Sequence, residues 1–508
     1  MHFYRIGSQT SSSSKGAERS VSRALAAAVL APLALAGCSN FADQPELNPR
    51  RWAPAAVERE WSPPPDAKPL VASPAAAAMS ENFPTPARGR RFALSELIDL
   101  GLRRNPSTRT AWHSAEAVAA AAGKARAPFY PMVRAQSENG YQRLVDLVPK
   151  HWGTLKTWQS RNQFSLDYDL LDFGRRDAVA SSALNQVIAA NLLFNRAVQQ
   201  VVFDVERSYY ELDAADASVD AAKATLKLAA TDRINAERRQ QHGLATQPEV
   251  LLARQRVAQA SYDLENARLA VSLAQADLAI ALGLRAGDAP EVEPLGNQSL
   301  PSSLAGDVEQ LIDSAVRERP DLAAKVSIVR AKQADVALAR AALYPTLSFT
   351  SFYGEQAFTY RLSNPETPTF TAMAPEYGTG VTLRWDVFTG FSRINSIRQA
   401  EAERDAARAD LTSGELDVAA NVWRAYYSYL TARRKYEYAE ALLAASESSY
   451  RSNFKSYALG LANIIDLLSA ERELASARFT IIQSKAELLI SAAAVSFATG
   501  AIAPEARP

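Results

Sequence analysis

Two segments of the chain alternate strictly between apolar and polar residues. They are Phe164-Ser165-Leu166-Asp167-Tyr168-Asp169-Leu170 and, 217 residues later, Val381-Thr382-Leu383-Arg384-Trp385-Asp386-Val387. Alternation with a period of two predicts a strand that has one apolar face and one polar face. Each segment follows a more weakly alternating partner, which begins near Phe129 in the first case and near Leu343 in the second. We therefore predict two long hairpins and no further strands.

Long helices are predicted after each hairpin. Residues 173–241 and 391–459 contain no proline, so each could form a helix of nearly 70 residues, roughly 100 Å long. The returning helices carry heptads in which large residues alternate with small ones. The large residues are Val250, Val257, Leu264, Val271 and Leu278 in the first half, and Leu467, Leu474, Ile481, Leu488 and Val495 in the second. A second apolar line, which is Leu269, Leu273, Ala276 and Ile280, predicts that each helix has two neighbours.

The hairpin and the helical pair recur because the chain is an internal duplication. Asn105-Pro106 returns as Arg319-Pro320, and Gly243-Leu244-Ala245 returns as Gly460-Leu461-Ala462. The first repeat is predicted at 91–295, with its hairpin at about 129–171 and its helical pair at about 173–283. The second repeat is predicted at 296–500, with a hairpin at about 343–388 and a helical pair at about 391–499. A short tail, 501–508, completes the chain.

The N-terminal region has the features of a secreted lipoprotein. Basic residues precede an uncharged segment from Ala24 to Ala36, as in a secretory signal peptide. That segment ends in Leu35-Ala36-Gly37-Cys38, which resembles the bacterial lipobox, so we expect a signal peptide at 1–37 and a covalent lipid on Cys38. The alternative is a signal peptide followed by an incidental buried cysteine. The proline-rich segment 38–90 is predicted to be an extended tether. Ser39 stands where lipoproteins retained in the inner membrane carry an aspartate, so the resemblance to lipoproteins implies the outer membrane.

Composition argues against several classes of protein. Basic and acidic residues number 56 and 55, so the net charge of +1 does not favour nucleic-acid binding. The four histidines lie far apart, there is a single cysteine, and no glycine-rich phosphate loop is present, so we expect no metal, no cofactor and no enzymatic activity. No apolar run after the N-terminal region reaches the ~18 residues of a spanning helix. Insertion into a membrane would therefore use the strands.

Four strands cannot form a stable membrane structure within one chain. An open sheet in lipid leaves two unpaired edges, and each unsatisfied backbone group in hydrocarbon costs several kcal/mol. The smallest outer-membrane barrels have about eight strands. We therefore expect a barrel shared between two, three or more copies of the chain.

The order of these features resembles the TolC-like outer-membrane factor family, in particular its lipoprotein branch. The resemblance rests on Leu94-Ser95-Glu96-Leu97-Ile98-Asp99, on the strand ends Asp169–Arg175 and Trp385–Gly390, and on the repeated Gly-Leu-Ala turns. It implies a homotrimer with a twelve-stranded barrel and a helical tunnel in the periplasm. It also implies a periplasmic adaptor and an inner-membrane pump, of the proton-driven RND type, as partners in the efflux of small molecules.

Two other functions remain open from the sequence. A duct of the same architecture could serve type I protein secretion. A lipid-anchored coiled-coil scaffold without a conduit would account for Cys38 and the heptads but would leave the amphipathic hairpins unexplained.

Two kinds of functional residue are predicted. In the family, acidic residues after the second turn ring the closed end of the tunnel, and Asp466 occupies the first such position, whereas Ser469 and Ala462 depart from the pattern. The alternative is that Asp466 only stabilises the first turn of a helix. The helical hairpin tips are expected to contact the adaptor, and the alternative is that they form only the turns between the helices. Their residues are Gly243, Leu244, Ala245 and Thr246 in the first repeat, and Gly460, Leu461, Ala462 and Asn463 in the second.

Overall fold

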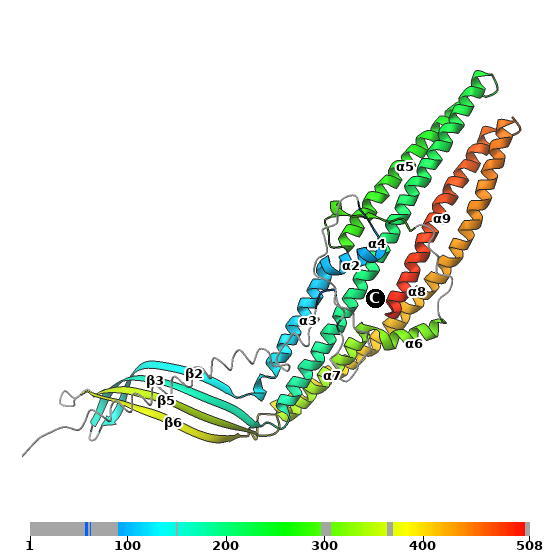
Figure 1. The fold of residues 1–508 in the computed structure, drawn as a ribbon. Coiled ribbons are helices and arrows are strands. Elements are labelled where there is room, and N and C mark those ends of the chain that lie inside the picture. The colour runs from blue at the N-terminus through cyan, green and yellow to red at the C-terminus, as the bar shows by residue number, and fades with distance from the viewer. Residues whose placement is uncertain are drawn as a thin grey trace, which may run out of the picture.

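The computed structural model is an elongated molecule with a β-sheet at one end and two helical hairpin tips at the other (Figure 1). It describes residues 56–58, 61, 90–148, 151–295, 306–362 and 369–502. The predicted duplication is confirmed, because each half contributes one strand hairpin followed by one long helix and a returning helix.

The large sheet contains four antiparallel strands in the order β2-β3-β5-β6. The first hairpin is β2 (Met132–Val148) with β3 (His151–Leu171), and the second is β5 (Thr346–Leu362) with β6 (Phe370–Arg384). Pairing of β3 with β5 joins the two hairpins, so β2 and β6 are the edges. The prediction of four strands was incomplete, because β1 (Arg91–Phe92) and β4 (Glu291–Val292) form a separate parallel pair. Two residues are too few to show a period of two.

The sheet has two chemically different faces, as the alternation predicted. Strand register places Leu166 directly opposite Val133 and Ser351, and places Asp167 opposite Met132 and Thr350. We call the face that bears Leu166 the apolar face and the face that bears Asp167 the polar face. The polar face carries two cross-strand ion pairs, Arg134 with Asp167 (3.6 Å) and Arg161 with Glu376 (3.3 Å).

The long helices α4 (Arg175–Gln241) and α8 (Ser392–Ala458) each have 67 residues. Each begins directly after the sheet, where the chain turns through two consecutive residues with positive φ. In the first repeat these are Phe173 and Gly174, and in the second they are Gly390 and Phe391. Glycine adopts this conformation readily, whereas phenylalanine is strained in it, so each turn combines one permissive and one strained residue.

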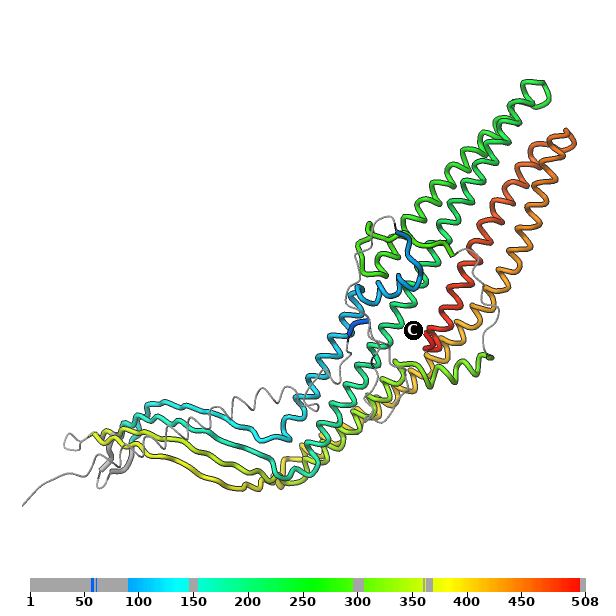
Figure 2. The backbone as a smooth tube through the Cα atoms, viewed as in Figure 1, coloured from blue at the N-terminus to red at the C-terminus, as the bar shows by residue number. Residues whose placement is uncertain are grey.

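Two shorter helices lie end to end along each long helix (Figure 2). In the first repeat, α5 (Gln247–Ala281) runs from the tip to the middle of the molecule, and α3 (Pro106–Ala125) continues from there toward the sheet. In the second repeat, α9 (Ile464–Thr499) and α7 (Pro320–Ala341) have the same arrangement. Short helices α2 (Leu94–Arg104) and α6 (Val308–Glu318) precede α3 and α7.

We call the meeting of two such helices a helix junction. At the first junction, Asn105 Nδ2 donates to the carbonyl oxygen of Ala281 at the end of α5 (2.9 Å). At the second, Arg319 Nη1 donates to the carbonyl oxygen of Ala498 near the end of α9 (3.2 Å). The C-terminus of one helix thus faces the N-terminus of the next, and their dipoles are aligned head to tail.

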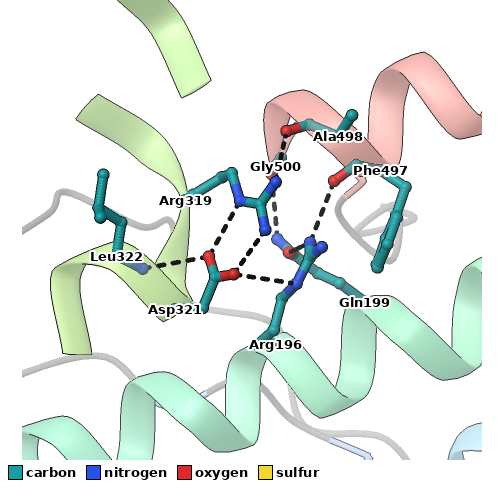
Figure 3. A network of polar contacts seen from close by, with 8 residues as sticks. All are labelled: Arg196, Gln199, Arg319, Asp321, Leu322, Phe497, Ala498 and Gly500. Atoms are coloured by element: carbon teal, nitrogen blue, oxygen red, sulfur yellow. Dashed lines mark hydrogen bonds and ion pairs between the residues drawn. The ribbon is translucent and has the colours of Figure 1, made fainter. Parts of the chain in front are cut away.

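The second junction is part of a larger polar network (Figure 3). Arg319 forms a two-point ion pair with Asp321, and Arg196 of α4 donates to the carbonyl oxygen of Phe497 (3.0 Å). Burial alone would raise the pKa of the Asp321 carboxyl, but its interactions with Arg319 and Arg196 lower it overall. The network therefore connects α9, α7 and the first repeat's long helix.

The predicted heptads form the contacts between the paired helices. Val250, Leu264 and Leu278 are buried on α5, as are Leu467, Leu474 and Leu488 on α9. The second apolar line of α5 is exposed in the single chain, and Leu269, Leu273 and Ile280 each expose more than half of their surface. Among the described helices, α9 alone has the length and composition of a membrane-spanning helix, but it packs against α8 and α4.

Candidate functional site at the helical tips

The first tip is a tight turn between α4 and α5. Gly243 adopts a left-handed conformation (φ 74°), and its N–H donates to the carbonyl oxygen of Gln240 (2.9 Å). The N–H of Leu244 donates to the carbonyl oxygen of Arg239 (2.8 Å), which completes a Schellman motif. Thr246 then precedes α5, and its N–H and hydroxyl both donate to the carboxylate of Glu249. The turn is therefore hydrogen-bonded on both sides.

The second tip repeats this geometry between α8 and α9. Gly460 has φ 77°, and its N–H donates to the carbonyl oxygen of Tyr457 (3.0 Å). The N–H of Leu461 donates to the carbonyl oxygen of Ser456 (2.8 Å). Asn463 caps α9 by accepting the N–H of Asp466 on its Oδ1 atom (2.9 Å). Two tips with nearly identical backbone conformations thus lie at the same end of the elongated molecule (Figure 1).

Both tips expose an apolar side chain. Leu244 is 67% exposed and Leu461 is 80% exposed, while Ala245 and Ala462 beside them are half-buried. The two motifs use only the backbone N–H groups of Leu244 and Leu461, so the hydrogen bonds of the turns do not require the leucine side chains. The tips therefore present two apolar side chains to solvent at the end of the molecule farthest from the sheet.

Asp466 lies at the third residue of α9, and its side chain is exposed. A carboxylate in the first turn of a helix is favoured by the helix dipole. Within the described part of one chain, Asp466 is not brought together with another predicted site residue except the capping Asn463. A ring of Asp466 side chains would need further copies of the chain.

Arg239 connects the two tips. Its Nη1 atom donates to the carbonyl oxygen of Tyr457 in α8 (2.7 Å), and its guanidinium lies 4.7 Å from the centroid of the Tyr457 ring. Sequence reasoning missed this contact, because an arginine in the last turn of a helix is usually explained by the helix dipole alone.

A group of buried ionisable side chains lies between the two helical pairs, below the tips. Asp232 of α4 is fully buried and accepts the hydroxyl of Tyr450 on α8 (3.3 Å). Arg256 of α5 donates to Glu471 of α9 (3.1 Å), and both side chains are buried. Burial, with a smaller effect of Glu471, raises the pKa of Asp232 to about 7. The four residues join all four helices of the tip region.

The sequence contained a weak signal for this group. Asp232 and Glu471 fall on helix faces that otherwise carry small or apolar residues, and such positions are expected to be buried. Pairing them required knowledge of which helices are neighbours, because Asp232 and Tyr450 are 218 residues apart along the chain.

Cys38 lies outside the described residues. Further along the N-terminal segment, Trp61 is buried against α4. Its backbone N–H donates to Asn195 Oδ1, and its backbone carbonyl oxygen accepts from Asn195 Nδ2, both at 2.9 Å. Sequence reasoning treated Trp61 only as part of the tether. The structure instead makes it a fixed point in the middle of the molecule.

Comparison with known proteins identifies relatives over most of the chain. Protein CyaE of Bordetella pertussis is 29% identical over 443 residues, which are 85% of this chain and 89% of CyaE. Outer membrane protein OprJ of Pseudomonas aeruginosa is 26% identical over 75% of this chain and 78% of its own.

Solved structures show the same fold. A membrane protein from Pseudomonas aeruginosa superposes with a TM-score of 0.71 at 24% identity, over 84% of this chain and all of that one. The outer membrane protein VceC from Vibrio cholerae superposes with a TM-score of 0.66 at 19% identity, over 80% and 96% of the two chains. The fold class predicted from the sequence is confirmed.

Residues 97–284 and 311–501 both match the outer membrane efflux protein family. Each matched segment contains one strand hairpin, one long helix and its returning helix, and together the two segments cover most of the chain. The predicted resemblance and the outer-membrane location are thereby confirmed. This protein belongs to the outer membrane efflux protein family and is an outer-membrane efflux channel.

Proposed function

We propose that three copies of this chain close into one exit duct that conducts small molecules from a periplasmic adaptor and an inner-membrane pump of the RND type. The observation that carries the proposal is the open sheet, whose edge strands β2 and β6 have no partner among the described residues of one chain. Three sheets of four strands give a closed barrel of twelve, which removes every edge.

The exposed face of α5 supports the same assembly. Leu269, Leu273 and Ile280 lie on the side of α5 that faces away from α4. In a closed ring of helices this side meets a helix of the next copy, so the apolar line is covered. A purified channel whose mass in detergent corresponds to one or two chains would contradict the trimer.

Small, largely apolar molecules are the substrates that the relatives support. ArpC of Pseudomonas putida, which is 24% identical over 90% of this chain, is named as an antibiotic efflux pump protein, and TtgC is named for toluene efflux. Cells that express the chain with its adaptor and pump should accumulate less of a fluorescent dye than cells that lack only this chain. Equal accumulation in the two would contradict small-molecule efflux.

The tips are the proposed contact with the adaptor. Replacing Leu244 and Leu461 together with glutamate leaves both Schellman motifs intact but places charges at the contact surface, so export and crosslinking to the adaptor should be lost. Gln247→Glu is the control, because it adds a charge to an exposed tip residue without removing a leucine. Full export and crosslinking by the double variant would refute docking at these residues.

Asp466 is the proposed acidic residue of the pore constriction. Three symmetry-related carboxylates would attract cations and repel anions. Asp466→Asn keeps the backbone N–H that Asn463 accepts, so the helix cap is retained. In planar bilayers this variant should lose cation preference; unchanged ion selectivity would leave Asp466 with only its role in the first helical turn.

Cys38 is the proposed lipid attachment site, and the position of Trp61 is compatible with it. Asn195, which binds Trp61, is 20 residues beyond the start of α4 and therefore about 30 Å from the sheet end of that helix. The 23 residues from Cys38 to Trp61 can span up to about 80 Å, so the anchor can reach the membrane. Labelled palmitate should enter the wild type and not Cys38→Ser, and equal labelling of both would disprove the assignment.

A further inference from the structure

Three cationic residues form a row across neighbouring strands of the sheet. Register pairs Arg143 of β2 with Lys156 of β3, and pairs the same Lys156 with Arg361 of β5. Directly paired residues of antiparallel strands lie on one face, with Cβ atoms about 5 Å apart. We call these three residues the basic row.

The basic row lies on the apolar face of the sheet. Lys156 is separated from Leu166 by ten residues of regular pairing along β3, and an even separation keeps it on the same face. The polar face carries the ion pairs Arg134 with Asp167 and Arg161 with Glu376, so it is the face suited to a water-filled lumen. The basic row therefore points toward the membrane side of the barrel.

Aromatic residues on this face place the basic row at a membrane interface. Near the helices, Tyr168 pairs with Phe349, and ten residues further along β3, Trp158 pairs with Tyr141. Ten residues at about 3.3 Å each and a tilt of about 40° span roughly 25 Å, the height of the apolar band between two aromatic girdles. Lys156 is two residues beyond Trp158, so the basic row lies at the headgroup level farther from the helices.

Some polar residues of the apolar face lie between the two aromatic pairs, and several of their side chains form hydrogen bonds with one another. Ser137 donates to Asn162 across the strands (2.6 Å), and Asn139 Nδ2 donates to the Ser137 hydroxyl (3.3 Å). Among the described residues of this face, the carboxylate nearest to the basic row belongs to Glu355, which is six residues before Arg361 on β5 and pairs with Asn162.

The basic row lacks a counter-charge within the described part of the chain. All three side chains are exposed, and none forms an ion pair with another described residue. Like charges placed directly opposite each other in a sheet are destabilising. An external anion that binds all three would relieve this repulsion.

We propose that the basic row binds the phosphate groups of a phosphorylated lipid headgroup in the outward-facing leaflet of the outer membrane. Arginine binds phosphate through two parallel hydrogen bonds, and lysine contributes a point charge. The aromatic pair Tyr141 and Trp158, with ring centroids 6.4 Å apart, lies beside the row on its membrane side and would contact the acyl chains of the same lipid. The site rests on insertion of the sheet as a barrel.

The test is binding of bisphosphoryl lipid A to the purified, full-length channel, counted by native mass spectrometry. The wild type should retain this lipid, whereas the triple variant Arg143→Gln, Lys156→Gln and Arg361→Gln should bind it on the order of 100-fold more weakly. A control that removes three exposed helical cations, Lys223→Gln, Arg330→Gln and Arg451→Gln, should bind as the wild type does. The charge-preserving pair Arg143→Lys and Arg361→Lys should retain most of the binding.

Several outcomes would overturn the proposal. Undiminished binding by the triple variant would remove the basic row from lipid recognition. Equal retention of phosphatidylcholine would indicate acyl-chain contact alone, and displacement by millimolar inorganic phosphate would indicate a general anion site. The mass of the assembly is read in the same spectrum, so failure of trimer formation is distinguished from failure to bind lipid. If the triple variant does not assemble, Lys156→Gln alone provides the comparison.

Discussion

The two helix junctions occupy equivalent places in the two repeats but use different side chains. The first is neutral, and Asn105 bridges the end of α5 and the start of α3 by donating to Ala281 and accepting from the N–H of Ser107. The second is charged, and buried Arg319 is paired with Asp321 and adjoins Arg196 of the first repeat (Figure 3). Both repeats thus keep the same end-to-end arrangement of helices. In addition, the second junction connects the second repeat to the first.

The largest expected effect on stability comes from replacing the glycine that packs against each junction, Gly283 at the first and Gly500 at the second. Comparing the two replacements distinguishes a clash with backbone atoms from a contact with a side chain. Both have positive φ, but a Cβ on Gly283 would lie 2.7 Å from the carbonyl oxygen of Arg104, whereas the three atoms nearest to one on Gly500 all belong to Arg319 and are 3.1 Å or more away. We expect Gly283→Ala to lower the free energy of unfolding by about 3–5 kcal/mol and Gly500→Ala by about 1–2 kcal/mol. Urea denaturation followed by circular dichroism measures both. Equal losses of unfolding free energy would show that both junctions tolerate an added Cβ equally well.

Charge at the second junction gives the next prediction. Arg319→Met leaves the partly buried Asp321 with Arg196 as its remaining cation, so we expect a loss of about 3 kcal/mol in unfolding free energy. Asn105→Ala removes neutral hydrogen bonds and should cost about 1 kcal/mol. A double-mutant cycle of Arg319→Met with Arg196→Met checks the coupling between repeats. A coupling energy near zero would mean that the second junction, like the first, does not depend on the other repeat.

Asp232 offers a smaller test, because the equivalent position in the second repeat is the uncharged Ser449. The pKa of Asp232 is about 7 in the folded chain, above its value in the unfolded chain, so the folded state holds the proton more tightly. Stability should therefore fall as the pH rises from about 4 to about 7 and remain lower above that. Asp232→Asn should be about 1–3 kcal/mol more stable than the wild type at pH 8 and similar to it near pH 4.

Thermal unfolding of Asp232→Asn and the wild type at several pH values measures this difference. Glu471 has a pKa raised in the same direction and is present in both proteins, so its contribution cancels to first order in the comparison. An identical pH dependence of the two proteins would show that Asp232 is not the titrating group.

Local periodicity was sufficient to predict most of the fold. Alternation identified β3 and β6, the absence of proline identified α4 and α8, and the heptads identified the buried side of α5 and α9. Each of these signals depends on residues close together in the chain, where geometry follows from a fixed period.

Contacts between distant segments could not be predicted in this way. The first junction joins residues 176 positions apart, and the contact of Trp61 with Asn195 joins residues 134 apart. Asn105 before a proline also fits an ordinary helix cap, which is one of its roles here. The basic row was missed because its three members become neighbours only through strand register, which alternation alone does not determine.

The sequence predicted the tips better than it predicted the constriction. Gly243 and Gly460 are required by the turn itself, so their positions follow from backbone geometry within a few residues. The role proposed for Asp466, in a ring of carboxylates, would arise only when several copies of the chain surround a common axis. One chain therefore contains the complete shape of the tips, but it contains only one member of the proposed ring.

Equal helix lengths constrain how such a duct can change size during evolution. α4 and α8 both have 67 residues, and each is paired with a returning helix through a heptad seam. An insertion of seven residues keeps the seam in register, whereas an insertion of three or four residues overwinds or unwinds the helical pair locally, so the tip region lengthens with least distortion in steps of about 10 Å. Each step needs a matching insertion in α4, α5, α8 and α9, or about 28 residues in total, if both tips are to remain level. Lengthening of a single tip loop would therefore leave the two tips at different heights.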